Sequence, residues 1–224
     1  MIVLAIDTAL DACSAAILQD DDVLWAERRI IGKGHSEALP PMVASGLAAA
    51  GVNPAAFDRV GVVIGPGAFA GVRVGLAFAR AFRLGLKADV VGVSTTHALA
   101  ASLGPHAGPT AIVFDARRGQ VYAAVYDAAL TEVVPPFVAR PSEATAKIEE
   151  AAPEGVLRFA GSGAALISHD SRSMVDSTLH ADPVAVARLA KAMAPVSAPP
   201  APLYLRPPDA APAAASPLAG LFRS

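Results

Sequence analysis

The sequence predicts an α/β protein in two halves of similar plan, and two observations support this. Short apolar runs typical of strands alternate with longer helical segments along the chain. One pattern then recurs, because Ile6-Asp7 followed by Ser14-Ala15-Ala16-Ile17 is matched by Phe114-Asp115 followed by Tyr122-Ala123-Ala124-Val125, at a constant offset of 108 residues. Spacing, polarity and the order of elements agree, so we interpret the chain as a duplication.

Residues 1–104 form the first predicted half. Its expected elements are strands at 2–6, 13–18, 23–30, 60–64 and 90–93 and helices at 36–50 and 72–86, with a short helix capped by Ser94. The first three strands follow one another through short turns and predict an antiparallel meander. Ser36 is expected to cap the first long helix, and Pro40 and Pro41 should delay its regular start.

Residues 105–194 form the second predicted half, after a hinge rich in proline and glycine. A capped helix is expected from Ser142, a strand before Gly161-Ser162-Gly163, and a last helix opened by Asp182-Pro183. The proline-rich tail, 195–224, cannot form regular helix or central strand. We expect part of it to pack back on the first half, with Tyr204-Leu205-Arg206 as an anchor.

Composition places the chain among folded proteins and limits its partners. Of the 224 residues, 54% are hydrophobic and 17% charged, which excludes disorder. The formal net charge of −2 excludes the positive field of a protein that grips nucleic acid unaided, so any such contact must be local or shared. Cys13 is the single cysteine and fits a reducing cytoplasm. The first apolar run ends at Asp7 without a basic leader, so we expect neither a secretion signal nor a membrane span.

A first buried strand that ends in an aspartate before a hairpin is how actin-like ATPases and sugar kinases hold a carboxylate beside nucleotide phosphates. Asp7, with Thr8, has this position, and Asp115 is its counterpart in the second half. Gly65 and Gly67 lie in a strand-to-helix loop whose amides could hold an anion. Two interpretations stay open: these residues form a vestigial phosphate loop, or they form a strand end and a tight connection in which glycines permit close backbone approach.

The sequence lacks local signatures of metal and hydrolytic chemistry. No two of its five histidines lie four residues apart, and it contains neither Cys-x-x-Cys nor a Gly-x-Ser-x-Gly elbow. We therefore expect no catalytic residue and no metal ligand in this chain.

The two long helices of the first half have the composition of a binding surface. No charged residue occurs between Ala38 and Phe57, so the first helix should bury two faces, with small side chains on the smoother one. The second helix aligns arginines on one face. Such a stripe is typical of a solvated face, but beside a charge-poor helix it also fits an interface with charged groups across it. The residues predicted for this interface are Leu39, Met42, Val43, Leu47, Arg73, Leu76, Arg80 and Arg83.

Six ordered blocks give the chain a resemblance to the TsaB family across nearly its whole length. They are Ala5-Ile6-Asp7-Thr8, His35-Ser36, Gly65-Pro66-Gly67-Ala68-Phe69-Ala70-Gly71-Val72-Arg73, Val91-Gly92-Val93-Ser94, Phe114-Asp115-Ala116-Arg117 with Tyr122, and Pro202-Leu203-Tyr204-Leu205-Arg206. Ala68 and Ala70 stand where the family usually carries Ser and Thr, which puts hydroxyl-mediated contacts of this loop in doubt.

The resemblance implies a duplicated actin-like fold of the ASKHA and ribonuclease H-like type, with two domains whose mixed β-sheets are flanked by helices. It implies a non-catalytic scaffold that pairs with and activates TsaD. TsaD is the paralogue that transfers a threonylcarbamoyl group to N6 of the adenosine next to the anticodon of tRNAs reading codons that begin with A. TsaE, an ATPase, completes the complex, and this chain meets tRNA indirectly through it.

For the isolated chain, the resemblance implies a homodimer without a bound cofactor, and ATP or ADP is expected in the assembled complex. TsaD carries paired metal-binding histidines after the strand equivalent to 90–93, where Thr95 and Leu99 stand here. Two rival interpretations remain. One is a stand-alone actin-like ATPase or sugar-kinase-like enzyme that uses Asp7, Asp115 and the glycine loops, and the other is a glycoprotease-type metallopeptidase, against which the missing histidines count.

Overall fold

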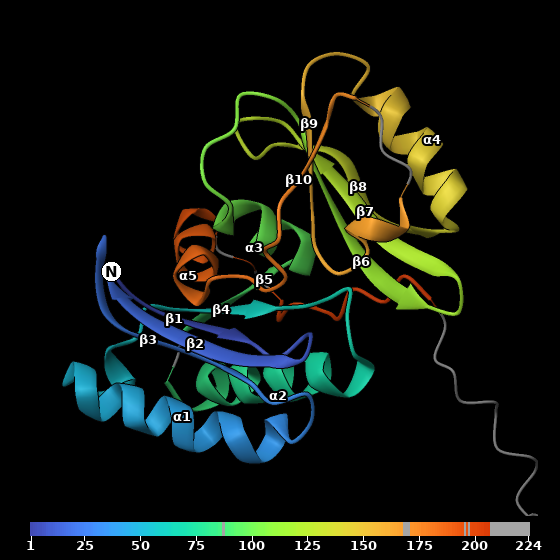
Figure 1. Cartoon of the computed structure of the whole chain (residues 1–224). Helices are drawn as coiled ribbons and strands as arrows, with labels where there is room; N and C mark the ends of the chain where they lie inside the picture. Colours follow the sequence, from blue (N-terminus) through green and yellow to red (C-terminus); the bar gives the residue numbers. More distant parts are fainter. Residues whose placement is uncertain (87, 168–170, 195, 197, 207–224) are drawn as a thin grey trace, which may run out of the picture.

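The computed structural model describes residues 1–86, 88–167, 171–194, 196 and 198–206 as two five-stranded sheets with helices between and outside them (Figure 1). The strands are β1 Ile2–Asp7, β2 Ala12–Gln19, β3 Asp22–Ile30, β4 Arg59–Val63, β5 Asp89–Val93, β6 Thr110–Arg117, β7 Gln120–Tyr126, β8 Glu132–Ala139, β9 Leu157–Ala160 and β10 Ser173–Val175. The helices are α1 His35–Ala50, α2 Phe69–Leu86, α3 Thr95–Ser102, α4 Pro141–Ala151 and α5 Pro183–Ala192, with single 3-10 turns η1 Pro54–Ala56 and η2 Ala164–Leu166.

Both sheets have the same strand order and the same strand directions. The first runs β3-β2-β1-β4-β5, and the second, taken from the matching edge, runs β8-β7-β6-β9-β10. In each sheet the first three strands of the half form an antiparallel meander, and the remaining two run parallel to the first strand. The predicted meander and the predicted duplication are therefore confirmed.

The constant offset of 108 residues does not hold for strand pairing, because the registers of the two hairpins differ by one residue. Ile6 pairs with Ala15 across the first hairpin, whereas Phe114 pairs with Tyr122 across the second. The second hairpin is shorter because its chain reverses through Arg117, Arg118 and Gly119 with φ angles of 62°, 56° and 69°. Positive φ at successive residues is what the tightest hairpin turns require.

The helices form layers on both faces of the first sheet (Figure 1). α1 and α2 cover one face, while α5 and α3 lie on the other, between the two sheets, and α4 packs on the second sheet beside β7 and β8. All five residues of β4 are buried, which explains why its residues 60–63 form a continuous apolar run instead of an alternating one. Within the described part of the chain, no helix is both long and apolar enough to cross a bilayer.

The helix α5 packs on the first sheet although it follows the second one in sequence. It lies against β1, β2 and β4. A Cβ atom added at Gly61 would come within 2.4 Å of the Ala190 Cβ atom, so the glycine lets the helix approach the strand closely. The division at residue 104 assigned this helix to the second half. The structure corrects that assignment, because the buried alanine face of α5 fits the surface of β4.

The helix α1 begins at His35, and Ser36 does not cap it. The N-cap is Gly34 in the left-handed region (φ 84°), and the Ser36 hydroxyl donates to Oε2 of Glu37 at 2.8 Å. Pro40 and Pro41 lie inside the helix without delaying its start. The carbonyls that they leave without an amide donor belong to Ser36 and Glu37, which are exposed and can be hydrated.

Two other helices also begin a few residues away from their predicted starts. α2 begins at Phe69, three residues before the predicted start, and α4 begins at Pro141 instead of after a capping Ser142. The predicted caps Ser94 and Asp182 are confirmed, since their side-chain oxygens accept the second or third amide of α3 and α5 at 3.1 and 2.9 Å.

Arg59, at the start of β4, ties α5 to the sheet. Its side chain is buried, and its Nη1 donates to the carbonyls of Ala190 at 2.9 Å, Lys191 at 3.2 Å and Met193. These carbonyls end the helix and have no amide donor within it. A guanidinium offers several donors in a fixed plane, so a single side chain can serve all three.

We expect Arg59→Met to lower the free energy of unfolding by roughly 2–4 kcal/mol, because buried carbonyls would lose their charged donor. Arg188→Met is the matched control. Arg188 is an exposed arginine of α5, the helix that Arg59 contacts, and its replacement should change stability little. Urea denaturation of both variants measures the difference. Equal losses would show that Arg59 does not hold α5.

Candidate functional site

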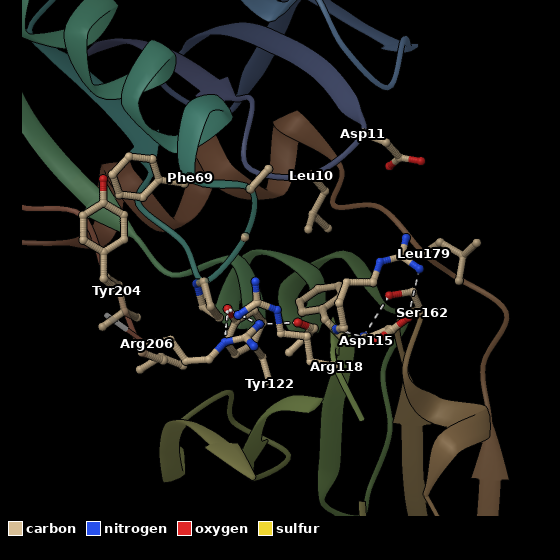
Figure 2. A pocket seen from close by; sticks show the side chains of 18 of the residues that line it. Leu10, Asp11, Phe69, Asp115, Arg118, Tyr122, Ser162, Leu179, Tyr204 and Arg206 are labelled. Atoms are coloured by element: carbon tan, nitrogen blue, oxygen red, sulfur yellow. Dashed lines mark hydrogen bonds and ion pairs between the residues drawn. The ribbon is translucent and has the colours of Figure 1, made fainter. Parts of the chain in front are cut away.

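A cavity of about 680 Å³ lies between the two halves (Figure 2). Its walls come from the β1–β2 turn, the loop after β4, the β6–β7 hairpin, the segment before α5 and the tail. The lining residues are Leu10, Asp11, Gly32, Pro66–Phe69, Phe114–Arg118, Tyr122, Ser162, Leu179, His180 and Leu203–Arg206. An actin-like enzyme would hold its nucleotide in this position, so the predicted phosphate-loop residues can be compared with it.

Asp7 and Thr8 connect neighbouring elements and do not belong to the cavity lining. The Asp7 side chain is 5% exposed, and its Oδ1 accepts a hydrogen bond from the Ala9 amide at 2.9 Å. Burial raises the pKa of Asp7 to about 6. The Thr8 hydroxyl donates to the carbonyl of Gly71 at 2.8 Å and so joins the β1–β2 turn to the start of α2.

The glycines after β4 allow backbone to pack on backbone. A Cβ atom at Gly67 would lie 2.2 Å from the Ala9 carbonyl oxygen, and one at Gly71 would lie 2.1 Å from the Thr8 oxygen. The amide of Ala68 donates to the Ala9 oxygen at 2.7 Å, so an anion cannot use this N–H. These contacts favour a tight connection over a phosphate loop.

Asp115 lines the cavity, and its carboxylate is bound by its own turn. Oδ1 accepts the Arg117 amide at 2.7 Å, and Oδ2 lies 3.2 Å from the Arg117 guanidinium. The Asp115 amide donates to Oγ of Ser162 at 3.2 Å. Gly161 repeats the packing of the first half, since a Cβ atom there would lie 2.4 Å from the Val113 oxygen. Each half therefore braces the end of its first strand with a glycine loop.

The described part of the tail first makes contact with the first half. The Leu203 amide donates to the carbonyl of Ile64 at 2.8 Å. A Cβ atom at Gly65 would lie 3.0 Å from the Leu203 oxygen, and Gly65 has a φ of 103°, where a side chain would be strained. Tyr204 stacks on Phe69 of α2, with ring centroids 4.8 Å apart (Figure 2). These contacts agree with the predicted return of the tail to the first half.

The tail then reaches the second half through Arg206, a residue of the predicted anchor whose contact with this half was not predicted. Its guanidinium donates to the Tyr122 hydroxyl at 3.2 and 3.3 Å, to Oε1 of Gln120 at 3.2 Å and to the carbonyl of Ala116. It also lies 5.4 Å from the Tyr122 ring centroid. Tyr122 and Arg206 both belong to the blocks that define the family resemblance, and this shared membership was the only sequence signal for their contact. Residues 207–224 of the predicted tail lie outside the described residues.

Thr95 and Leu99, which stand where TsaD is expected to carry histidines, are buried on α3 at 1% and 0% exposure. Across the described ranges, no group of three or more His, Cys, Asp or Glu side chains is arranged to hold a metal ion. The expected lack of catalytic and metal-binding residues stays a prediction.

Four of the eight predicted interface residues are wrong. Leu39, Met42, Val43 and Leu76 are between 0% and 3% exposed and belong to the core beneath the first sheet. Their apolar spacing reflects burial of one helix stripe against the sheet, which a helix on any sheet requires. Leu47 is half-buried and packs against the same core.

A second stripe of the two helices is uncovered, and we name it the α1–α2 face. Arg73 and Arg80 are exposed there, Arg83 is half-buried, and Leu84 is 89% exposed. The α1–α2 face consists of Pro41, Ser45, Ala48, Ala49, Arg73, Ala77, Arg80 and Leu84. Most of these side chains are small or uncharged, which suits close approach by another helix.

The two matched sheets with a cleft between them define an actin-like protein. A family model described as TsaD, tRNA N6-adenosine threonylcarbamoyltransferase, matches residues 29–199. The chain therefore belongs to this family. Within it, the chain is similar to the TsaB (YeaZ) proteins. It is 36% identical over 128 residues to the tRNA threonylcarbamoyladenosine biosynthesis protein TsaB of Escherichia coli, and 35% identical over 138 residues to that of Bacillus subtilis.

These sequence matches are partial, whereas the structural ones extend further. The aligned segments cover 56% of this chain and 55% of the E. coli relative, and 60% of both this chain and the B. subtilis relative. YeaZ from Pseudomonas aeruginosa has a TM-score of 0.73 at 26% identity and covers 85% of this chain and 90% of its own. Another crystal structure, of a protein with similarity to peptidase YEAZ from P. aeruginosa, has a TM-score of 0.80 at 26% identity, with 92% and 99% covered.

The packing of the glycine loop can be tested on one helix. Gly71→Ala should lower the free energy of unfolding by about 2–4 kcal/mol, because the added methyl would meet the fixed Thr8 backbone. Gly85→Ala is the control on α2, since nothing lies within 4 Å of a Cβ atom there. It should be neutral or stabilising by up to about 1 kcal/mol through helix propensity. Thermal melting measures the stability of both variants. Equal melting temperatures for Gly71→Ala and Gly85→Ala would contradict this packing.

The buried Asp7 carboxyl predicts a pH dependence of stability. Because its pKa is raised from 3.8 to about 6, the folded chain holds this proton to higher pH than the unfolded chain does. The free energy of unfolding should therefore fall as pH rises through that interval, by up to roughly 3 kcal/mol.

Asp7→Asn should remove this fall and be more stable than the parent at pH 7, since the amide oxygen can still accept from Ala9. Asp115→Asn is the control and should keep the fall, because it leaves the buried Asp7 carboxyl unchanged. Denaturant titrations across the interval provide the measurement. A parent curve parallel to that of Asp7→Asn would rule out the buried charge as its source.

Proposed function

We propose that this chain is a non-catalytic scaffold subunit in tRNA threonylcarbamoyladenosine formation, and that it pairs with TsaD through the α1–α2 face. The observation that carries the proposal is this face itself: two neighbouring helices whose outer side chains are mostly small or uncharged and are exposed in the described chain, with tail contacts only at Arg73 and Arg80. The names of the E. coli and B. subtilis relatives support the pathway, since both are biosynthesis proteins of threonylcarbamoyladenosine.

The non-catalytic role is supported by the way the cleft is built. Asp7 is buried against its own turn, the Ala68 amide is bound by Ala9, and the tail occupies one wall of the cavity. A stand-alone ATPase or kinase would need these groups free to meet phosphates and Mg²⁺. On this proposal, transfer of the threonylcarbamoyl group to adenosine N6 takes place on TsaD, and the present chain supplies a surface that activates it.

The remaining assignments follow from the same proposal. TsaE joins the pair, tRNA is met through the assembled complex, and ATP or ADP binds there and not to this chain alone. Without TsaD, the α1–α2 face pairs with a second copy of the chain, because an uncovered helix face of this kind favours association. The reaction belongs to the cytoplasm.

Ala48→Arg tests the face without disturbing the core. Ala48 is exposed on α1, so the arginine should leave the fold intact but place a bulky charge where a helix would approach. We expect affinity for TsaD to fall by at least about 100-fold and modification by the reconstituted complex to fall with it. Ala146→Arg is the matched control on α4, where an exposed alanine lies on the other half.

The measurements are thermal melting, TsaD binding by calorimetry, and threonylcarbamoylation with and without this chain. A folded Ala48→Arg chain that binds TsaD like the Ala146→Arg control would remove the α1–α2 face as the docking site. Full modification by TsaD and TsaE in the absence of this chain would overturn the scaffold role. Saturable ATP turnover by the purified chain would favour the ATPase alternative.

A further inference from the structure

Two arginines of the α1–α2 face are held in place by the tail. Nε of Arg73 donates to the Tyr204 hydroxyl at 3.2 Å, and its guanidinium lies 4.2 Å from the Phe69 ring centroid. Nη2 of Arg80 donates to the Pro200 carbonyl at 3.0 Å. Figure 2 shows Tyr204 beside Phe69, where the tail passes the beginning of α2. The tail therefore fixes side chains that would otherwise move freely in solvent.

These contacts orient the two guanidiniums without neutralising them. A tyrosine hydroxyl, an aromatic ring and a backbone carbonyl carry no full negative charge. Among the described residues, neither Arg73 nor Arg80 forms an ion pair. Each guanidinium uses one nitrogen for the tail and keeps its other N–H donors for a second group. An oriented guanidinium with spare donors is suited to bind a carboxylate through two parallel hydrogen bonds.

The helices behind this face are positive on a chain that is negative as a whole. α1 and α2 contain three arginines, at 73, 80 and 83, and one carboxylate, Glu37, which gives a charge of 3 − 1 = +2. The whole chain has a charge of −2, so the remaining residues sum to −2 − 2 = −4. The face therefore has the opposite sign to the rest of the protein.

We infer that the α1–α2 face selects a partner surface that carries carboxylates opposite Arg73 and Arg80, and that it binds such a surface more tightly than it binds a second copy of this chain. This inference rests on the proposed function of the face. In a two-fold symmetric pair the same patch meets itself, so arginine-bearing helices oppose one another. An acidic partner instead neutralises both arginines, whose side-chain freedom the tail has already reduced. The tail residues Pro200 and Tyr204 are thus positioning residues of the docking surface.

Salt distinguishes the two kinds of association. Raising NaCl from about 50 mM to about 500 mM shortens the screening length severalfold, so attraction and repulsion both weaken. We expect affinity for TsaD to fall by about tenfold over this range, while self-association stays constant or becomes tighter. TsaD binding is measured by calorimetry and self-association by sedimentation equilibrium. TsaD affinity that does not change with salt would overturn the inference.

Charge reversal identifies the residues. Arg80→Glu should weaken TsaD binding at low salt by at least about tenfold and leave self-association equal or tighter. Arg188→Glu is the control, because it makes the same change in net charge on an exposed arginine of α5 and should bind TsaD normally. Arg80→Gln, which removes the charge alone, replaces Arg80→Glu if the latter melts early. Tyr204→Phe should lower TsaD affinity severalfold without changing the melting temperature, because it frees Arg73 but keeps the stacked ring.

The outcomes separate this inference from the proposed function. If Ala48→Arg blocks TsaD binding while Arg80→Glu and Tyr204→Phe do not, the face still docks the partner and the charge-based selection is wrong. If none of the three variants affects binding, both proposals fail. Loss of TsaD binding by Arg80→Glu together with a normal Arg188→Glu control supports the inference.

Discussion

The contact on which the first half depends is between two backbones: the turn after β1 and the loop that opens α2. Gly67 and Gly71 have no side chains, so the loop lies directly on the carbonyls of Ala9 and Thr8, and the Ala68 amide closes the contact. This fixes the start of α2, and α2 in turn presents the arginines of the α1–α2 face. The same contact encloses Asp7 and takes up an amide that a nucleotide-binding relative would need. One packing constraint therefore both positions the arginines of the α1–α2 face and takes up the Ala68 amide.

The two halves share a plan but are joined by elements that break it. α5 comes after the second sheet in sequence and packs on the first, where Arg59 holds the carbonyls at its end. The tail contacts both halves, because Leu203 bonds to Ile64 of the first and Arg206 bonds to Tyr122 of the second. These contacts link the two halves to each other.

Much of the fold could be predicted because local patterns determine it. The meander, the matched sheet orders and the caps Ser94 and Asp182 follow from apolar runs and short polar signals that act within a few residues. Errors arose where two local signals competed or where the partner was distant. Ser36 was a plausible cap, but the N-cap is Gly34 in the left-handed region, two residues earlier. The register of the second hairpin depends on positive φ at Arg118, which no apolar pattern encodes.

The candidate site was predicted less well for a related physical reason. Helical periodicity identifies which side chains share a stripe, but a stripe buried against a sheet and a stripe buried against a partner look the same in sequence. Leu39, Met42, Val43 and Leu76 were therefore assigned to the wrong surface, whereas the exposed arginines could be recognised by their charge alone. The contact of Arg206 with Tyr122 spans 84 residues, and no local pattern carries it.

Asp7 shows why resemblance in position does not establish resemblance in chemistry. Its place at the end of β1 is that of a nucleotide-binding carboxylate, yet its neighbours are backbone groups of its own turn. The Ala9 amide donates to Asp7, and the Thr8 hydroxyl donates to the carbonyl of Gly71. Here enclosure raises the pKa, which means that the protein pays in stability to keep this charge at neutral pH. The fold thus places Asp7 at the end of the first strand, in surroundings that disfavour its charged form.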